Sequence, residues 1–243
     1  MLVSLGVWQL HRLDWKRELI QRVDARVHAR PVAEPGPTRW PFVSPDQHEY
    51  LRVRMQGHYL NDRETLVQAV TRLGPGFWVM TPFETVEGYV VLVNRGFVPS
   101  AQRDAATRLQ GQIEGETTVI GLLRMTEVKG GFLRDNDSSN DRWYSRDVAA
   151  ISVARGVTNS APYFIDADAI EPALIGAPVG GLTVIAFTNN HLQYAFTWFA
   201  LALMLAGGTL VELRHEWYLR RSQATSPIGQ ESHSSRSTSP HAC

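Results

Sequence analysis

The stretch that decides the architecture runs from His191 to Val211 and reads HLQYAFTWFALALMLAGGTLV. From Leu192 onward, twenty residues pass without a charged side chain. At a helical rise of about 1.5 Å per residue they cover about 30 Å, which is the thickness of the hydrocarbon core of a bilayer. The sequence therefore predicts a transmembrane helix, surrounded by the lipid bilayer, within residues 189–213.

One face of this predicted helix begins with polar and aromatic side chains and continues with small ones. Spacings of three and four residues put these side chains on one side of the helix. They are His191, Tyr194, Ala195, Trp198, Ala202 and Ala206. This face is a candidate binding face. The alternative is an ordinary membrane boundary, where aromatic residues form belts and small residues mark the close approach of another helix.

The distribution of basic residues predicts the orientation of the span. No Lys or Arg occurs between Arg155 and Arg214, whereas three arginines follow the span within residues 214–221. Basic residues beside a membrane helix are retained on the cytoplasmic side. We therefore expect residues 12–188 to form an extracytoplasmic domain and the C-terminus to be cytoplasmic.

Composition narrows the possible functions. The formal net charge is zero, which argues against a nucleic-acid partner. The single cysteine, Cys243, forms no intramolecular disulfide, and the chain has no CxxC motif for zinc or copper. It lies in a cytoplasmic tail, residues 214–243, whose end is rich in Ser, Thr, Pro and His, and we expect this tail to be largely disordered.

The chain opens with residues 1–11, MLVSLGVWQLH, an apolar-leaning segment too short to cross a bilayer. It lacks the basic region that begins a signal peptide. Trp8 followed by His11 and basic residues is typical of the outer end of a helix that leaves a membrane. We therefore expect residues 1–11 to be the remnant of a first transmembrane helix, and the protein to be multi-pass when that helix is complete.

The domain between the helices is predicted to be rich in short strands. Apolar positions within Arg12–Arg30 have helical spacing and predict an amphipathic helix, and a second, short helix is expected at Val148–Arg155, capped by Asp147 and ended by Gly156. Short alternating or apolar runs separated by turn residues predict strands. The fold class is therefore α+β and β-rich, with an antiparallel sheet or barrel. The predicted strands are Leu51–Met55, Thr65–Thr71, Phe77–Phe83, Tyr89–Asn94, Thr117–Leu123, Pro162–Asp166 and Leu182–Phe187.

No motif of an enzyme was found in this domain. The chain lacks a GxSxG elbow, an HExxH motif, a P-loop and a nucleotide-binding fingerprint. Alternating polar residues resemble the start of a calcium loop at Asp135, Asp137, Ser139 and Asp141, but Asn140 and Arg146 replace the expected Gly and Glu. A solvated turn is the better interpretation. We expect no catalysis, and a membrane-tethered hydrolase ranks last because no nucleophile and base pair is recognisable.

Arg95 is a candidate for binding an anion. It lies in the segment Asn94-Arg95-Gly96-Phe97-Val98-Pro99, which is expected to end a buried strand in a turn. We prefer the interpretation that Arg95 pairs with a carboxylate of the protein. The functional alternative is that its guanidinium points toward an anionic ligand such as a propionate, which it can hold with two hydrogen bonds.

Four motifs in one order resemble the surfeit locus protein 1 family, which assists the assembly of cytochrome c oxidase and is associated with haem a delivery. The resemblance covers about residues 5–213. The motifs are Leu5-Gly6-x-Trp8-Gln9-x-x-Arg12-x-x-x-Lys16, Asn94-Arg95-Gly96-Phe97-Val98-Pro99, Trp143-Tyr144-x-Arg146-Asp147 and Asn189-Asn190-His191-Leu192-x-Tyr194-Ala195-x-Thr197-Trp198-Phe199. The chief departure is at the N-terminus, where most of the family's first membrane helix is missing.

The resemblance implies a role that the residues alone do not give. It implies a non-enzymatic assembly factor of a bacterial plasma membrane that binds haem a transiently and aids its insertion into oxidase subunit I, with haem a synthase as a second partner. His191 matches the family's proposed ligand of the haem iron, and a neutral imidazole is a common axial ligand. Trp198 and Tyr194 are expected to pack on the porphyrin. The alternative is a scaffold that stabilises oxidase subunit I or haem a synthase and binds no cofactor.

Overall fold

The structure is a computed structural model that describes residues 1–128, 134–170, 175–183 and 190–224. The chain divides into two compact units. One, here called the β-rich domain, is Arg17–Phe187, and the other, here called the helical unit, combines Met1–Lys16 with Thr188–Cys243. The predicted α+β, β-rich fold class is confirmed.

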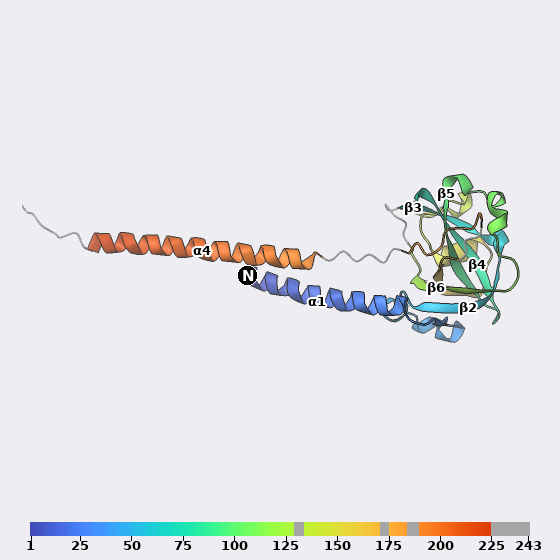
Figure 1. Cartoon of the computed structure of the whole chain (residues 1–243), viewed down its shortest axis with the longest axis horizontal. Coiled ribbons are helices and arrows are strands. Elements are labelled where there is room, and N and C mark those ends of the chain that lie inside the picture. The colour runs from blue at the N-terminus through green and yellow to red at the C-terminus, as the bar shows by residue number, and fades with distance from the viewer. Residues whose placement is uncertain (129–133, 171–174, 184–189, 225–243) are drawn as a thin grey trace, which may run out of the picture. The chain divides into compact units, whose positions relative to one another are not determined.

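The β-rich domain contains a closed five-stranded barrel (Figure 1). Its strands follow one another in the order β2-β6-β7-β5-β4, and the barrel closes because β2 also pairs with β4. The short strand β1 adds beside β2, and β3 adds beside β4. The strands are β1 (Val32–Ala33), β2 (Arg52–Tyr59), β3 (Thr65–Thr71), β4 (Gly74–Thr85), β5 (Val90–Pro99), β6 (Thr117–Met125) and β7 (Ser160–Ala167).

The barrel contains both parallel and antiparallel strand pairs, whereas the strand pattern of the sequence predicted an antiparallel sheet or barrel. Strands β5 and β7 pair in parallel, and the other four pairings around the barrel are antiparallel. The reason is one of parity: strand direction cannot alternate all the way around a closed ring of five strands. One neighbouring pair must run in the same direction, and the last strand to be made, β7, forms that pair.

Two clusters of buried side chains lie on opposite faces of the sheet and share β5. Val91 and Val93 belong to one cluster and Leu92 to the other, so both faces of this strand are covered. Burial on both faces explains why Val90–Val93 is continuously apolar instead of alternating. The first cluster is Val53, Met55, Tyr59, Phe83, Tyr89, Val91, Val93, Val119, Leu123, Ala161, Tyr163 and Ile165, and the second is Val67, Met80, Leu92, Trp143, Val148, Ile151 and Phe164.

Helix α3 (Val148–Ala154) covers the second cluster with Val148 and Ile151. As predicted, Asp147 caps the helix, and its carboxylate accepts a hydrogen bond from the Ala150 amide at 3.1 Å. Gly156 follows the helix with φ of +61°, a left-handed conformation that ends helices and suits glycine. The shorter helical segments of the domain are η1 (Pro37–Phe42), α2 (Pro45–His48), η2 (Asn61–Arg63), η3 (Ser100–Gln102), η4 (Ala105–Gly111) and η6 (Ser138–Asn140).

Most of the predicted strands occur with bounds shifted by a few residues, and two predictions about strands differ from the structure more deeply. The segment Asn94–Pro99 does not end a strand in a turn, because β5 continues through it to Pro99. Of the predicted strand Leu182–Phe187, Leu182 and Thr183 are not in a strand, and residues 184–187 lie outside the described residues. Polar side chains misled the first prediction, since Asn94 and Arg95 are buried within β5 and find their partners inside the domain.

The closure of the barrel gives a stability prediction at Gly57. A Cβ atom added to Gly57 would overlap the Glu84 carbonyl group where β2 pairs with β4. We expect Gly57→Ala to lower the free energy of unfolding by about 3 kcal/mol, the upper end of the usual range for overpacking. Urea unfolding of the full chain in mild detergent, followed by tryptophan fluorescence, measures this change.

The matched control is Gly36→Ala. The nearest atom to an added Cβ there is 3.8 Å away, which is ordinary contact. This variant is expected to unfold within about 0.5 kcal/mol of the wild type. Equal stability of the two variants would contradict the role assigned to Gly57.

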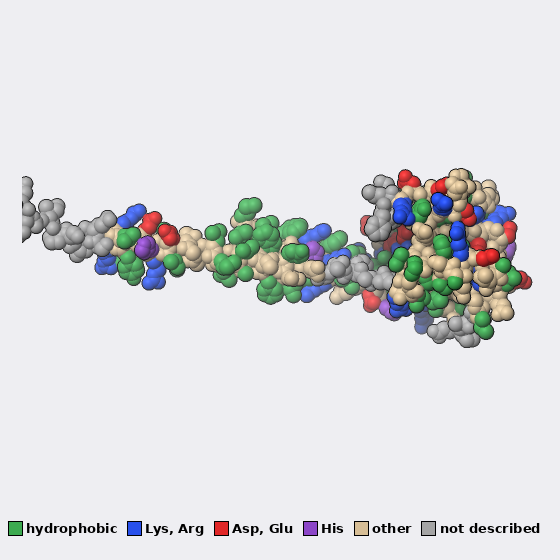
Figure 2. All heavy atoms as spheres, turned by 90° about the horizontal axis from the view of Figure 1, so that it is seen from above, with side chains coloured by type: hydrophobic (Ala, Val, Ile, Leu, Met, Phe, Trp, Pro, Cys, Tyr) green, Lys and Arg blue, Asp and Glu red, His purple; other side chains and the backbone are tan. Residues whose placement is uncertain are grey.

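The helical unit contains helix α4 (His191–Ala224) and the first part of helix α1 (Leu2–Val27). Among the described residues, α4 alone is long and apolar enough to cross a membrane, within His191–Arg221, where the mean hydropathy of its most apolar stretch is 1.6. Hydrophobic side chains cover its middle and charged ones its C-terminal end (Figure 2). The helix extends past residue 213 to Ala224, so the beginning of the predicted tail is helical, and residues 225–243 lie outside the described residues.

Candidate functional site

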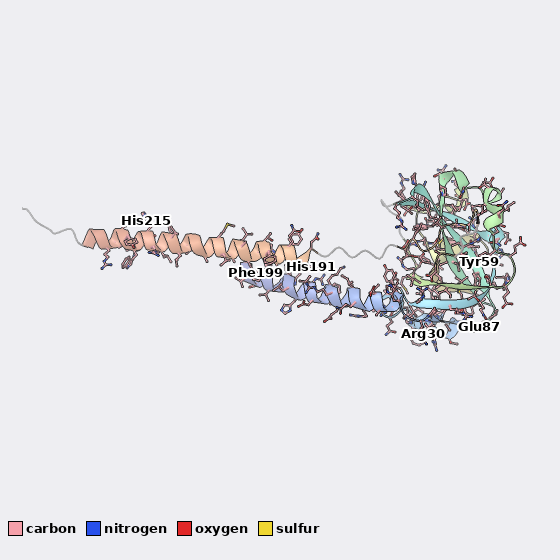
Figure 3. All side chains as sticks on the ribbon, in the orientation of Figure 1. Arg30, Tyr59, Glu87, His191, Phe199 and His215 are labelled. Carbon is pink, nitrogen blue, oxygen red and sulfur yellow. The ribbon has the colours of Figure 1, made fainter. Side chains whose placement is uncertain are left out.

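Helices α1 and α4 approach each other closely at Gly6. A Cβ atom added to Gly6 would lie 2.6 Å from the Phe199 ring, closer than such atoms can come. The absence of a side chain at Gly6 therefore lets the aromatic ring pack against the α1 backbone. Figure 3 shows Phe199 and His191 on the part of α4 that lies beside α1.

The facing sides of the two helices follow helical spacing. On α4, His191, Ala195 and Phe199 are four residues apart, and Ala195 is buried. On α1, Gly6 and Gln9 are three residues apart, and Gly6 is buried. The two helices run antiparallel here, because Gly6 contacts Phe199 whereas Gln9 bonds to His191.

His191 is held by a hydrogen bond across this contact. Its ring Nδ1 lies 2.8 Å from the side-chain oxygen Oε1 of Gln9, and both residues are half-buried. The second ring nitrogen, Nε2, has no hydrogen-bond partner among the residues that the structure describes. The imidazole is thus fixed through one nitrogen and retains the other for a ligand.

The predicted binding face divides into two flanks around His191. At about 100° per residue, Trp198 and Tyr194 lie about 20° and 60° to one side of His191, whereas Ala195 lies about 40° to the other side. Ala195 is buried toward α1, but Tyr194 is 54% exposed and Trp198 is half-buried. His191 therefore stands at the border between the helix contact and an open aromatic flank.

These residues fit the chemistry of haem binding. A neutral imidazole nitrogen is a common axial ligand of haem iron, and aromatic side chains offer flat surfaces to a porphyrin. The free Nε2 of His191 can supply the axial nitrogen. Tyr194 and Trp198 offer the flat aromatic surfaces from the same side of α4. Among the described residues, no cluster of three or more His, Cys, Asp or Glu forms an alternative metal site.

Arg95, the fourth predicted site residue, lies in the β-rich domain and is 6% exposed. Its guanidinium donates to the Asn61 side-chain oxygen at 3.1 Å and to the Gly111 carbonyl oxygen at 2.7 Å. It also lies 4.9 Å from the centre of the Tyr59 ring. These partners are uncharged, whereas the sequence predicted a carboxylate, because neutral side-chain and backbone oxygens can also accept the hydrogen bonds of a guanidinium. The geometry gives Arg95 a structural role, and a role in holding an anionic ligand stays a prediction.

Burial shifts the pKa values of this pair in opposite directions. Burial lowers the pKa of Arg95, and the nearby Tyr59 and Glu64 act against this change. Burial also raises the pKa of the Tyr59 phenol to about 12, although the positive charge of Arg95 opposes the shift. Tyr59 therefore stays neutral at physiological pH and packs against a charged guanidinium.

A second polar centre of the β-rich domain is the carboxylate of Asp166. It accepts hydrogen bonds from Asn94 at 2.8 Å, Arg124 at 2.8 Å, Arg146 at 3.0 Å and Thr183 at 2.9 Å. It is only 4% exposed and lines a cleft of about 330 Å³. The two arginines also bind Glu49 and Glu127, so Arg124, Arg146 and Asp166, which line this cleft together with Arg72, are already paired.

Sequence reasoning missed two of these features. Gln9 was named only as part of a motif, although its spacing of three from Gly6 could have placed both on one face of α1. For Asp166 the sequence pattern predicts only the end of a strand. The signal that could have found it is an acidic residue directly after the apolar run Tyr163-Phe164-Ile165, since a buried carboxylate needs donors from neighbouring strands.

The fold and the site together define a class of protein. It is a membrane-anchored protein with a β-barrel domain and an imidazole at the start of its apolar helix. The chain belongs to the SURF1 family, whose model matches residues 1–203.

The similarity to relatives extends over most of the chain. Surfeit locus protein 1 of Homo sapiens is 34% identical over 216 residues, which cover 82% of this chain and 69% of the human protein. The protein of the same name from Takifugu rubripes is 34% identical over 216 residues, covering 82% and 86%. A SURF1-like protein of Monosiga brevicollis is 36% identical over 212 residues, covering 82% and 78%. The resemblance found in the sequence motifs is therefore confirmed.

Family membership supports a role in the assembly of cytochrome c oxidase. The family is one of assembly factors and not of enzymes, in agreement with the absence of a catalytic motif in the sequence. Subunits of the oxidase are accordingly the partners that this membership indicates.

Proposed function

We propose that this protein carries haem a on the flank of α4 formed by His191, Tyr194 and Trp198, and delivers it to subunit I of cytochrome c oxidase. The observation that carries the proposal is the hydrogen bond that fixes the His191 ring through Nδ1 and leaves Nε2 available. Haem a is cargo in this role, so no bond within it is made or broken.

A carrier must hold its cargo and also release it. One imidazole supplies a single axial bond to the iron, and the exposed Tyr194 flank offers only partial enclosure. A second histidine on an acceptor protein can then replace His191 without a deep pocket having to open. The β-rich domain contributes by holding the partner, and haem a synthase is the expected donor.

The topology of the proposed carrier follows from its arginines. None occurs from residue 156 to residue 213, and several lie near the C-terminal end of α4. We place that end in the cytoplasm and the β-rich domain outside the bacterial plasma membrane. His191, the first residue of α4, then lies at the outer surface of the bilayer.

The test is the absorption spectrum of the full-length protein purified from cells that make haem a. We expect a Soret band that copurifies with the protein and falls by more than about tenfold in His191→Ala, because even removal of a group behind a metal ligand costs about that much. The matched control is His215→Ala, an exposed histidine farther along α4 (Figure 3), which should retain the band. Unchanged haem content and oxidase maturation in His191→Ala would refute the carrier role of His191.

A scaffold without cofactor is the second candidate. The observation that favours it is the exposed apolar tip of the hairpin formed by β3 and β4, where Val70 is 86% exposed and Leu73 is 52% exposed. Such side chains suit contact with another protein. Copurification of oxidase subunit I without haem, abolished by charged residues at Val70 and Leu73, would support this function in place of the carrier.

A further inference from the structure

We infer that Gln9 is a positioning residue for His191: it fixes the tautomer in which Nδ1 carries the proton and Nε2 presents its lone pair to a metal. This inference rests on the proposed function for its biological meaning. It concerns a different residue on a different helix, and its first test needs no haem.

The direction of the hydrogen bond determines the tautomer. The oxygen Oε1 of Gln9 has no proton to donate, so the His191 nitrogen 2.8 Å away must be the donor. A neutral imidazole carries one ring proton, and that proton is then on Nδ1. Nε2 is left as an acceptor, which is the state that binds a metal.

The surroundings of the pair make this bond effective. Its neighbours along the two facing stripes are Gly6, Ala195 and Phe199, none of which has a polar side chain. A hydrogen bond that lies against apolar surfaces is stronger than one fully surrounded by water. The close contact of Gly6 with Phe199, one turn from Gln9, holds the two backbones at the distance that the bond requires.

Gln9 corresponds to the group that commonly stands behind a metal-bound histidine. Such a group accepts the other ring proton, orients the ring and raises its basicity, and its loss typically reduces metal affinity by about 10- to 100-fold. The bond joins residues 182 positions apart in the chain, so it also brings α1 into the ligand site. Gln9 therefore controls the ligand through His191 and does not itself contact the iron.

The first test uses the haem-free full chain in detergent micelles. Histidine ring nitrogens are labelled, and NMR correlations with the ring protons on carbon identify the protonated nitrogen. The His191 signals are those that vanish in His191→Ala. We expect the proton on Nδ1 in the wild type and in Gln9→Glu, which keeps an acceptor oxygen. In Gln9→Leu, which has a similar shape and no acceptor, we expect the proton to move largely to Nε2. A proton on Nε2 in the wild type, or the same tautomer in Gln9→Leu, overturns the inference.

The second test measures binding of added haem a and the reduction potential of the bound haem. Gln9→Leu is expected to bind about 10- to 100-fold more weakly than the wild type. Gln9→Glu is expected to bind nearly as well and to lower the reduction potential, because a carboxylate makes the imidazole more electron-rich. The control is Gln193→Ala, an exposed glutamine on α4, with both quantities unchanged. Equal affinity and potential in Gln9→Leu and the wild type overturn the inference.

The two proposals fail in different ways. If the wild type binds no haem a while Gln9→Leu still changes the His191 tautomer, the proposed carrier function is wrong and the positioning by Gln9 stands. If the wild type binds haem a through His191 and neither the tautomer nor the potential depends on Gln9, the carrier function stands and the positioning is wrong.

Discussion

Replacing Asp166 with alanine is expected to destabilise the β-rich domain by about 3–5 kcal/mol, the usual cost of breaking a buried ion pair from one side. The carboxylate is 4% exposed and lies between Arg124 and Arg146, whose guanidinium groups are also largely buried. Its removal leaves both positive charges without their shared partner. It also leaves the Asn94 side-chain amide without an acceptor.

The surroundings of Arg146 explain why this loss cannot be repaired by a small movement. Its guanidinium lies 4.7 Å from the centre of the Phe164 ring and 5.9 Å from that of Trp78. These aromatic contacts hold the side chain in place. The charges of Asp166 and Glu49 together raise the pKa of Arg124 despite its burial, which by itself would lower it.

Thermal unfolding of the full chain in mild detergent, followed by circular dichroism, measures the effect. At about 2–4 °C per kcal/mol, the Tm of Asp166→Ala should fall by about 10 °C. The control is Asp62→Ala, because the Asp62 side chain is 77% exposed and its ion pair with Arg63 contributes little. A Tm of Asp166→Ala close to that of Asp62→Ala would show that the network does not depend on Asp166.

Replacing Gly6 with leucine is expected to separate helices α1 and α4 and to reduce haem a retention about as far as Gln9→Leu does, by about 10- to 100-fold. Even a Cβ atom at this position meets the Phe199 ring at 2.6 Å, and leucine adds a larger group beyond it. The hydrogen bond between Gln9 and His191, 2.8 Å long, lies one helical turn away. It is expected to break when the helices move apart.

The variant Gly6→Ala separates the effect of the helix contact from the effect of helix propensity. Alanine in a helix interior is favoured over glycine by about 1 kcal/mol, so the local preference of α1 improves while the contact is lost. Reduced haem retention in this variant must then come from the contact between the helices. The control is Gly207→Leu on α4, where nothing lies within 4 Å of an added Cβ atom. Haem retention in Gly6→Leu equal to that in Gly207→Leu would contradict this account.

The strands were predictable where buried and exposed residues alternate in the sequence. In β2, buried and exposed residues alternate along the strand, and the sequence shows the same alternation. The bounds of β3 were predicted to the residue. The continuation of β5 to Pro99 was not predictable from local pattern. Arg95 resembles the end of a strand until Asn61 and Gly111, which are distant in sequence, provide its partners.

The candidate site was predictable only where it depends on local sequence. The apolar run and the motif around His191 identified α4 and its opening residue. The partner of His191 was not predictable from the run itself, because Gln9 belongs to a segment at the other end of the chain. Helical spacing also treats the predicted binding face as uniform. Only the position of α1 shows that Ala195 faces a helix whereas Tyr194 is exposed.

The odd number of barrel strands has a consequence for the order of folding. Strand β7 inserts between β5 and β6, yet it is made about 35 residues after β6 and last of all. Until then β5 and β6 each present an unpaired edge, and contacts between strands distant in sequence are the slow ones to form. The newly made domain therefore exposes two unpaired strand edges until residues 160–167 have been synthesised and pair with them. A chaperone that shields strand edges would act on this intermediate and not on the closed barrel.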